Sequence, residues 1–558
     1  MTAIGDLASQ YIDELADLSP NAATAMGVPG HDHRITDFSP EGFDRLQDLR
    51  RRYLAALTRT PVEHERDRVA RDMMSESLAN QSESYDAGDH FRGLSILGSP
   101  LQSIRSVFDS MPKATASDWE TITTRLEQVP TALDRFRETL VAGVERGLVP
   151  ALRQVEECAK QCDTWSGATG GAPFFQTLVD THEATGLDDK AIATGLRSAA
   201  DSGSAAFADF GNFLRNTLAP VANPKDAVGP DRYLVEARGF TGATLDLEET
   251  YRWGWEQLYE VEEEMRATAD RIQPGASISE AVSLLESDPA RAIEGVERFR
   301  GWMQDFQDRA IAELNGKHFD IPEPIQRIEA MIAPPGGALA MYYTGPSEDF
   351  SRPGRTWYPT GGKTRVPLWG EVSIAYHEGV PGHHLERASV KYQAETLTRY
   401  QRMFGTSGYV EGWALYAERL MAELGFLENP DYYLGMLRAQ ALRSVRVVVD
   451  IGMHLELEIP RSEKEIGGQP WTPELGHAFT RDRSQFPPDF TASEVTRYLG
   501  LPGQAISYKV GERVWLESRS LAKQRLGAAF DLKQWHAEAF RLGPMGLDQM
   551  KREMARQG

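Results

Sequence analysis

Apolar residues recur at helical spacing along most of the chain. One apolar stripe covers residues 122–144, behind a predicted capping box formed by Ser117 and Glu120. A second long helix is predicted from about Leu245 to Ile272, where its apolar face stops just before a Pro-Gly pair. A third is predicted from an N-cap at Asp288 to about Asn315. Wide apolar stripes with charged opposite faces are typical of packed helices, so the pattern predicts a mainly α protein.

The pattern changes between about Phe319 and Pro367. Proline and glycine cluster there, and short runs such as Arg355–Tyr358 are typical of strands or extended loops. The sequence therefore predicts a small β insert, after which helical spacing resumes. A chain of 558 residues can form two or more lobes. A polar, proline-containing stretch predicts a boundary near residue 223, between an N-terminal helical lobe (1–223) and a C-terminal lobe (224–558).

Composition and charge narrow the possible partners. Hydrophobic residues make up 41% of the chain and charged residues 25%, which is typical of a soluble globular protein. The formal net charge of −22 argues against nucleic acid or an anionic membrane surface, because both attract basic patches. We find neither a signal-peptide pattern nor an apolar run near the ~18 residues of a membrane span. Because only Cys158 and Cys162 are present, we expect a cytoplasmic protein; its oligomeric state stays open.

The strongest chemical signal is the segment His377-Glu-Gly-Val-Pro-Gly-His383-His384. It nearly matches His-Glu-x-x-His, in which two histidines one helical turn apart bind zinc. His377 and His383 are six residues apart, so a regular helix would place them on different faces and ~9 Å apart along its axis. Pro381 cannot continue a regular helix, since its ring clashes with the carbonyl of residue 377. Omitting Val380 and Pro381 restores the spacing His-Glu-Gly-Gly-His, which predicts an interrupted zinc-binding helix.

A third zinc ligand is expected on a nearby helix. Glu411 begins the helical stretch Glu-Gly-Trp-Ala-Leu-Tyr-Ala-Glu, 28 residues after His383. Catalytic zinc sites use three protein ligands and a water, and a carboxylate is one of the usual ligands. Glu378, next to the first histidine, is at the position of a general base that takes a proton from the water. The pattern predicts zinc bound by His377, His383 and Glu411, with His384 as the alternative to His383.

These motifs, followed by Leu501-Pro-Gly-Gln-Ala-Ile-Ser-Tyr508-Lys-Val-Gly511, resemble the domain-of-unknown-function 885 family over essentially the whole chain. That family is similar, more distantly, to helical zinc peptidases of the thermostable carboxypeptidase, thimet oligopeptidase and angiotensin-converting enzyme type. The resemblance implies a mainly α, two-lobed fold with a deep channel and the zinc-binding helix at its floor. It also implies Glu411 as third ligand and Tyr508 as a donor to the oxyanion. Those peptidases have an unbroken His-Glu-x-x-His, unlike this chain.

Four further residues are candidates for supporting roles. Arg446, Asp450 and His454 share one helical face, where they either form internal ion pairs or support the zinc ligands. Arg446 could also bind a substrate carboxylate. His384 is a candidate donor to a ligand or a contact for substrate.

Together these features predict a zinc-dependent hydrolase that cleaves the peptide bonds of short peptides through a metal-activated water. The β insert could pair with the substrate as an added strand. Two alternatives remain open: a zinc amidase for non-peptide substrates, and a metal-binding or peptide-binding protein without turnover.

Overall fold

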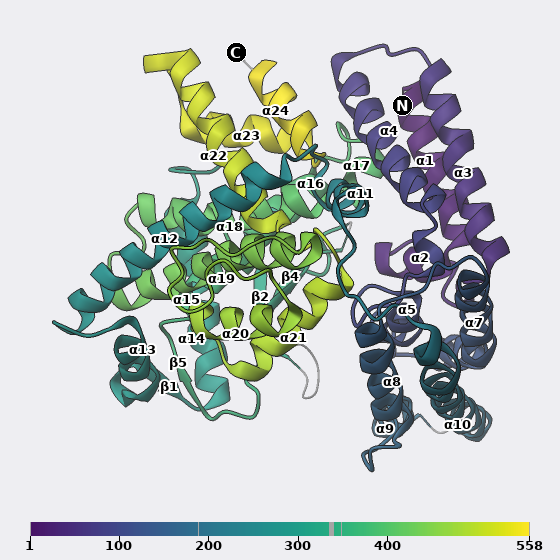
Figure 1. Ribbon diagram of the computed structural model, residues 1–558. Helices are drawn as coiled ribbons and strands as arrows, with labels where there is room; N and C mark the ends of the chain where they lie inside the picture. Colours follow the sequence, from purple (N-terminus) through teal and green to yellow (C-terminus); the bar gives the residue numbers. More distant parts are fainter. Residues whose placement is uncertain (1, 188, 334–339, 348, 557–558) are drawn as a thin grey trace. The chain divides into compact units, whose positions relative to one another are not determined.

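The computed structural model describes residues 2–187, 189–333, 340–347 and 349–556. Within these residues the protein is mainly helical, with two small sheets, as the apolar spacing predicts (Figure 1). The chain divides into two compact units. One comprises Met1–Pro61, Leu78–Val228 and Thr496–Leu501, and the other comprises Val62–Ser77, Gly229–Val495 and Pro502–Gly558. No helix among the described residues is long and apolar enough to cross a membrane.

The described residues of the first unit form helices and connecting loops, with no strand among them. Its helices are α1 (Ala3–Leu18), α2 (Pro20–Met26), α3 (Pro40–Arg59), α5 (Pro100–Ser106), α6 (Ala116–Leu126), α7 (Val129–Glu145), α8 (Leu152–Ser166), α9 (Gln176–Ala184) and α10 (Lys190–Phe213). Helices α4 (Glu65–Asp86) and α21 (Pro488–Gly500) have residues in both units. The long helix α10 packs against α6, α7, α8 and α9. The core between them includes the fully buried rings of Trp119, Phe136, Phe175 and Phe207.

The predicted start of α6 is wrong. Its N-cap is Thr115, whose side chain accepts from the backbone N–H of Asp118 while the Asp118 carboxylate accepts in return. The stripe over residues 122–144 belongs to two helices, α6 and α7, and not to one. Pro130 lies in the first turn of α7, where a missing backbone N–H costs nothing.

The second unit carries the candidate site. Its helices are α11 (Pro230–Thr241), α12 (Leu247–Ile272), α13 (Ile278–Ser287), α14 (Val296–Leu314), α15 (Glu371–Glu378), α16 (His383–Tyr392), α17 (Arg399–Met403), α18 (Ser407–Glu423), α19 (Pro430–Leu455), α20 (Pro473–Ser484), α22 (Ser507–Leu526), α23 (Leu532–Leu542) and α24 (Leu547–Arg556). Almost every residue of α19 between Leu434 and His454 is buried, as expected for a central helix. Helix α12, as predicted in extent, lies beside α19, and α18 packs against α22 (Figure 1).

The predicted β insert is confirmed for the residues that the structure describes, which omit 334–339 and 348. Strands β2 (Ile328–Ile332) and β4 (Gly354–Tyr358) pair in parallel, and β3 (Tyr342–Thr344) pairs antiparallel with the other edge of β4. Strand β5 (Arg365–Pro367) pairs with β1 (Ala292–Glu294). Asp288 is an N-cap as predicted, but only of the 3-10 turn Pro289–Arg291, because residues 292–294 form a strand and α14 begins only at Val296.

A buried histidine makes the stability of the second unit depend on pH. His536 of α23 is 1% exposed, and its Nε2 lies 2.8 Å from the Tyr416 hydroxyl oxygen. Burial lowers the pKa of His536 from 6.5 to about 3, and the Arg519 charge acts in the same direction. Since the pKa in the folded state is depressed, the unfolded state binds the proton first as pH falls below 6.5.

We therefore expect the midpoint temperature of thermal unfolding to decrease as the pH is lowered from 6.5 to 4. His536 should reduce the free energy of unfolding by up to about 1.4 kcal/mol per pH unit in this range. His536→Phe should show a shallower fall in that range, measured by scanning calorimetry. Tyr416→Phe is the control, because it removes the hydroxyl partner and keeps the imidazole, so its pH dependence should stay steep. Equal slopes for wild type and His536→Phe would contradict this prediction.

Candidate metal centre

The histidine motif spans two helices joined by a tight turn. Helix α15 ends at Glu378 and α16 begins at His383, so the predicted bulge within one helix is instead a complete interruption. The Val380–Pro381 peptide bond is cis, and the Gly382 N–H donates to the Tyr376 carbonyl at 3.0 Å. The interruption falls where Pro381 and Gly382 predict it.

Gly382 makes this turn possible. A Cβ atom at that position would lie 1.9 Å from the His377 carbonyl oxygen, so a larger residue would force the two helices apart. The turn is fixed to α18 by Trp413, whose Nε1–H donates to the Pro381 carbonyl at 2.9 Å. The same contact therefore ties the two histidines to the helix that carries Glu411.

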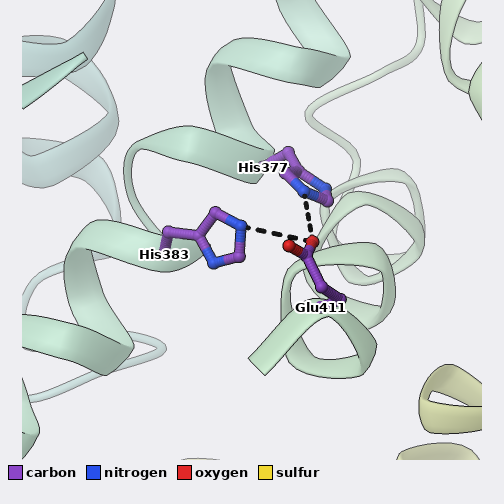
Figure 2. Close-up of side chains that lie close together, drawn as sticks. All are labelled: His377, His383 and Glu411. Carbon is purple, nitrogen blue, oxygen red and sulfur yellow. Dashed lines mark ion pairs between the residues drawn. The ribbon is translucent and has the colours of Figure 1, made fainter. Parts of the chain in front are cut away.

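His377, His383 and Glu411 point toward one another from three helices (Figure 2). Glu411 Oε2 lies 3.3 Å from His377 Nε2 and 3.4 Å from His383 Nε2. Ligand atoms ~2.0–2.2 Å from one zinc ion in tetrahedral geometry are about 3.4 Å from each other. The donor set therefore fits a zinc ion, and so do the two distances to Glu411; the three ligand atoms all lie within 4.8 Å of one another.

The electrostatics of this cluster favour a cation. Glu411 Oε2 is buried and accepts no hydrogen bond of good geometry from any described residue. Burial acts to raise the pKa of Glu411, but the His383 and His377 rings hold it well below its usual range. Burial acts to lower the pKa of His377, yet the adjacent Glu411 and Glu418 carboxylates raise it to about 9. The carboxylates thus stabilise positive charge at this point.

Glu418 orients the first histidine. Its Oε1 lies 2.8 Å from His377 Nδ1, and its Oε2 accepts a hydrogen bond from the Ser373 hydroxyl. Glu418 is fully buried and lies two turns after Glu411 on α18. A carboxylate on the second nitrogen of a metal-binding histidine fixes the ring and leaves Nε2 for the metal. The sequence alone does not distinguish Glu418 from an ordinary helix charge, although its i+7 spacing from Glu411 places both on one helix face.

His384 turns away from the cluster. Its Nε2 lies 2.7 Å from the Ile325 carbonyl oxygen, and the Tyr343 hydroxyl lies 3.0 Å from its Nδ1. Burial lowers the pKa of His384 to about 4, so the ring is neutral and both nitrogens are hydrogen-bonded. The geometry therefore favours His383 over His384 as the second histidine of the cluster.

A cavity of about 570 Å³ opens beside the three residues. Its wall combines apolar side chains with charged ones, namely Glu371, Glu378, Arg387, Glu411, Arg438, Arg443 and Arg446. Tyr508 also lines it. Burial raises the pKa of Glu378, and the His383, His377 and Arg443 charges partly offset this.

A glycine contact brings Tyr508 to the same cavity as Glu411. A Cβ at Gly412 would lie 2.5 Å from the backbone of Gly511, so α18 and α22 cross with their main chains in contact. Gly412 follows Glu411 directly, and Gly511 comes one turn after Tyr508. Close crossing of these helices therefore places both side chains at one wall.

Of the three residues on α19 predicted to support the site, only Arg446 is at the cavity. Arg446 lines the cavity, with its guanidinium carbon 4.5 Å from the centre of the Tyr508 ring. Asp450 and His454 are not among the described residues of that wall. The Asp450 carboxylate accepts hydrogen bonds from the Tyr233 hydroxyl at 2.7 Å and the Gly503 N–H at 2.9 Å. Asp450 thus connects α19 to α11 and to the segment before α22 by hydrogen bonds.

The fold and the site define a mainly helical protein with a His-His-Glu cluster on three helices. Residues 20–554 match the family described as "Bacterial protein of unknown function (DUF885)", and the chain belongs to this family. The family membership expected from the motifs is thereby confirmed.

Two solved structures share the fold over almost the entire chain. One, described as a "putative lipoprotein" from Colwellia psychrerythraea, is 22% identical, covers 99% of each chain and gives a TM-score of 0.85. The other, a "putative lipoprotein of unknown function" from Shewanella oneidensis, is 17% identical and gives a TM-score of 0.73. The match covers 99% of this chain and 100% of the Shewanella chain. No functionally curated protein matches this chain. At these identities the likeness shows the fold alone, and the expected cytoplasmic location stays a prediction.

The choice between the two adjacent histidines can be tested by metal content. We expect purified His383→Ala protein to lose nearly all bound zinc, and His384→Gln protein to keep it, when zinc is measured by inductively coupled plasma mass spectrometry. His384→Gln is the matched control, since it alters the adjacent imidazole and retains a polar side chain. Full zinc retention in both variants would refute the site as drawn.

The Glu418 contact predicts a weaker but not absent metal site. Glu418→Gln should lower zinc affinity about 10- to 100-fold, because the His377 ring loses a charged partner. The affinity is measured by competition with a chromophoric chelator. Glu423→Gln, an exposed change on the same helix, should leave the affinity unchanged. An unaltered affinity in Glu418→Gln would show that the contact does not orient the ligand.

Proposed function

We propose that this protein is a zinc-dependent hydrolase that cleaves peptide bonds of short peptides. The observation that carries the proposal is the convergence of His377, His383 and Glu411 at 3.3 and 3.4 Å, on the wall of a cavity that Glu378 also lines. Two imidazoles and one carboxylate are a usual donor set of catalytic zinc. Zinc bound there supplies a Lewis acid that lowers the pKa of a coordinated water and polarises a carbonyl group.

Glu378 is the proposed general base. It is the last residue of α15, directly after His377, and its side chain faces the cavity. A carboxylate at this position takes a proton from the attacking water and passes it to the leaving nitrogen. The carboxylate is only 8% exposed, so solvent screens it little.

Tyr508 is the proposed donor to the oxyanion. The first turn of α22 holds its ring at the cavity wall, and Arg446 lies against the ring face. A phenol fixed in this way donates a hydrogen bond to negative charge that develops on the scissile carbonyl oxygen. The nearby guanidinium stabilises the same negative charge.

The cavity favours short substrates. Its volume of about 570 Å³ lies within the usual range of small-ligand sites. Tyr342 and Tyr343 of β3 line one wall, so an extended peptide could add to that strand. We also propose that the protein is similar to helical zinc peptidases, with their two lobes and deep channel. The His377-Glu378 pair at the end of one helix and Glu411 on another helix support this likeness.

The test of turnover is Glu378→Gln. We expect the variant to keep its zinc and to lose hydrolysis of short peptides by at least about 100-fold in kcat, because a neutral amide cannot take the proton. Hydrolysis is followed by mass spectrometry on a library of peptides and small amides. Glu395→Gln, an exposed change, is the control and should keep wild-type activity.

Each alternative gives a different result in this assay. Hydrolysis confined to the non-peptide amides would identify an amidase. Zinc and peptide binding without hydrolysis, unchanged in Glu378→Gln, would identify a binding protein and refute the proposed enzyme.

A further inference from the structure

One face of α19 presents three arginines to the cavity beside the candidate metal centre. Arg438, Leu442 and Arg446 follow one another at four-residue spacing, and Arg443 lies next to them. Side chains at this spacing share a helix face. The chain as a whole has a formal charge of −22, so a basic wall at this cavity runs against its overall composition.

Two of these arginines have partners in the protein. Arg446 Nη2 donates to Glu494 Oε2 at 2.6 Å. The Arg438 guanidinium carbon lies 4.0 Å from the centre of the Trp369 ring and 4.4 Å from that of Phe486, so it is held between two aromatic rings.

Among the described residues, Arg438 and Arg446 each also have one buried nitrogen without a hydrogen-bond partner, but Arg443 lacks both an ion pair and a close ring contact, because the centre of the Tyr508 ring lies 5.7 Å from its guanidinium carbon. Arg443 is only 7% exposed, and its Nε has no hydrogen-bond partner among the described residues. Its Nη1 donates one long hydrogen bond, 3.4 Å, to the Ala439 carbonyl of its own helix. No carboxylate of the described residues forms an ion pair with it within 4.0 Å. The Arg443 charge nevertheless acts on Glu378, which places it in the electrostatic environment of the proposed general base.

A guanidinium stays protonated, and a buried charge without a partner costs free energy. Its planar N–H groups match the two oxygens of a carboxylate. None of the carboxylates that face the cavity from the described residues, Glu371, Glu378 and Glu411, accepts a hydrogen bond from Arg443, whose Nε is left without a partner. An anion from outside the protein therefore has a prepared partner at this wall.

We propose that Arg443 binds a carboxylate of the substrate, so that the enzyme selects peptides that carry a carboxylate close to the bond cleaved. This inference rests on the proposed function and adds the substrate class. A peptide supplies this chemistry in two ways, through its C-terminal carboxylate or through an Asp or Glu side chain. Arg443 thereby sets specificity, while Glu378 and Tyr508 act on the reacting atoms.

The activity test uses three peptides that differ only at the last residue: a free C-terminal Phe, a C-terminal Phe amide, and a C-terminal Glu amide. Wild type should prefer a carboxylate-bearing peptide, and which one it prefers identifies the source. Arg443→Met should lower kcat/KM on the preferred peptide about 10- to 100-fold and change that on the Phe amide less than about 3-fold. Arg443→Lys should recover part of the preference, because it keeps the charge and loses the planar fork.

The control is Arg252→Met, which removes an exposed arginine of α12 and should keep the wild-type preference. An equal loss of kcat/KM on all three peptides in both Arg443 variants would overturn the inference, because a structural or Glu378-directed role does not distinguish acid from amide. Absence of any acid preference in wild type would overturn it as well.

A binding measurement separates this inference from the proposed function. Isothermal titration calorimetry compares N-acetylphenylalanine with N-acetylphenylalaninamide on the purified protein. Wild type should bind the acid at least about 10-fold more tightly, and Arg443→Met should remove that difference. Tighter binding of the acid in a protein that cleaves no peptide would retain the carboxylate site and refute the hydrolase. Peptide cleavage without any difference between acid and amide would retain the hydrolase and refute the carboxylate site.

Discussion

The candidate site depends on the close contact between Gly382 and the end of α15. The Gly382 backbone lies against the Tyr376 and His377 carbonyl oxygens, and only a residue without a side chain fits there. A regular helix would separate His377 and His383 by about 9 Å along its axis, and this contact removes that separation. The two imidazole rings instead lie with their centres 4.8 Å apart. A metal site on this motif therefore requires the interruption, and is not weakened by it.

A second backbone contact completes the site independently of the first. The crossing of α18 and α22 at Gly412 and Gly511 sets the positions of the backbone atoms from which the Glu411 and Tyr508 side chains extend. Trp413 then joins the two arrangements, because its indole N–H donates to Pro381 in the turn between the histidines. The site is thus built from rigid helix ends held by main-chain contacts, which position ligands more accurately than loops do.

The sequence predicts the parts of this site that depend on local chemistry. Pro381 and Gly382 predict the interruption, and the spacing to Glu411 predicts a second helix with a carboxylate. It does not predict Arg443, because which face of α19 meets the cavity depends on packing against α12, α15 and α20. For the same reason the helix predicted from Asp288 does not continue: Asp288 caps only the turn Pro289–Arg291, and residues 292–294 then pair with β5. At α6 the error is local, since Thr115 and Asp118 offer the same capping chemistry two residues earlier.

The distribution of charge links the metal cluster to the cavity around it. Glu411 and Glu418 surround the histidines with negative charge, which favours a cation, whereas α19 supplies positive charge on the facing wall. Arg446 forms an ion pair with Glu494 and lies over the Tyr508 ring. The guanidinium carbon of Arg443, three residues earlier, lies 5.7 Å from the centre of the same ring. One helix face thus places two guanidinium groups beside the Tyr508 ring at the cavity. Because Arg443 and Arg446 are only 7% and 6% exposed, solvent screens their charges less than it screens surface charges. An anionic group in the cavity would be repelled by Glu378 and Glu411 and attracted by the arginines of α19, so in this acidic protein α19 is the wall that favours an anion.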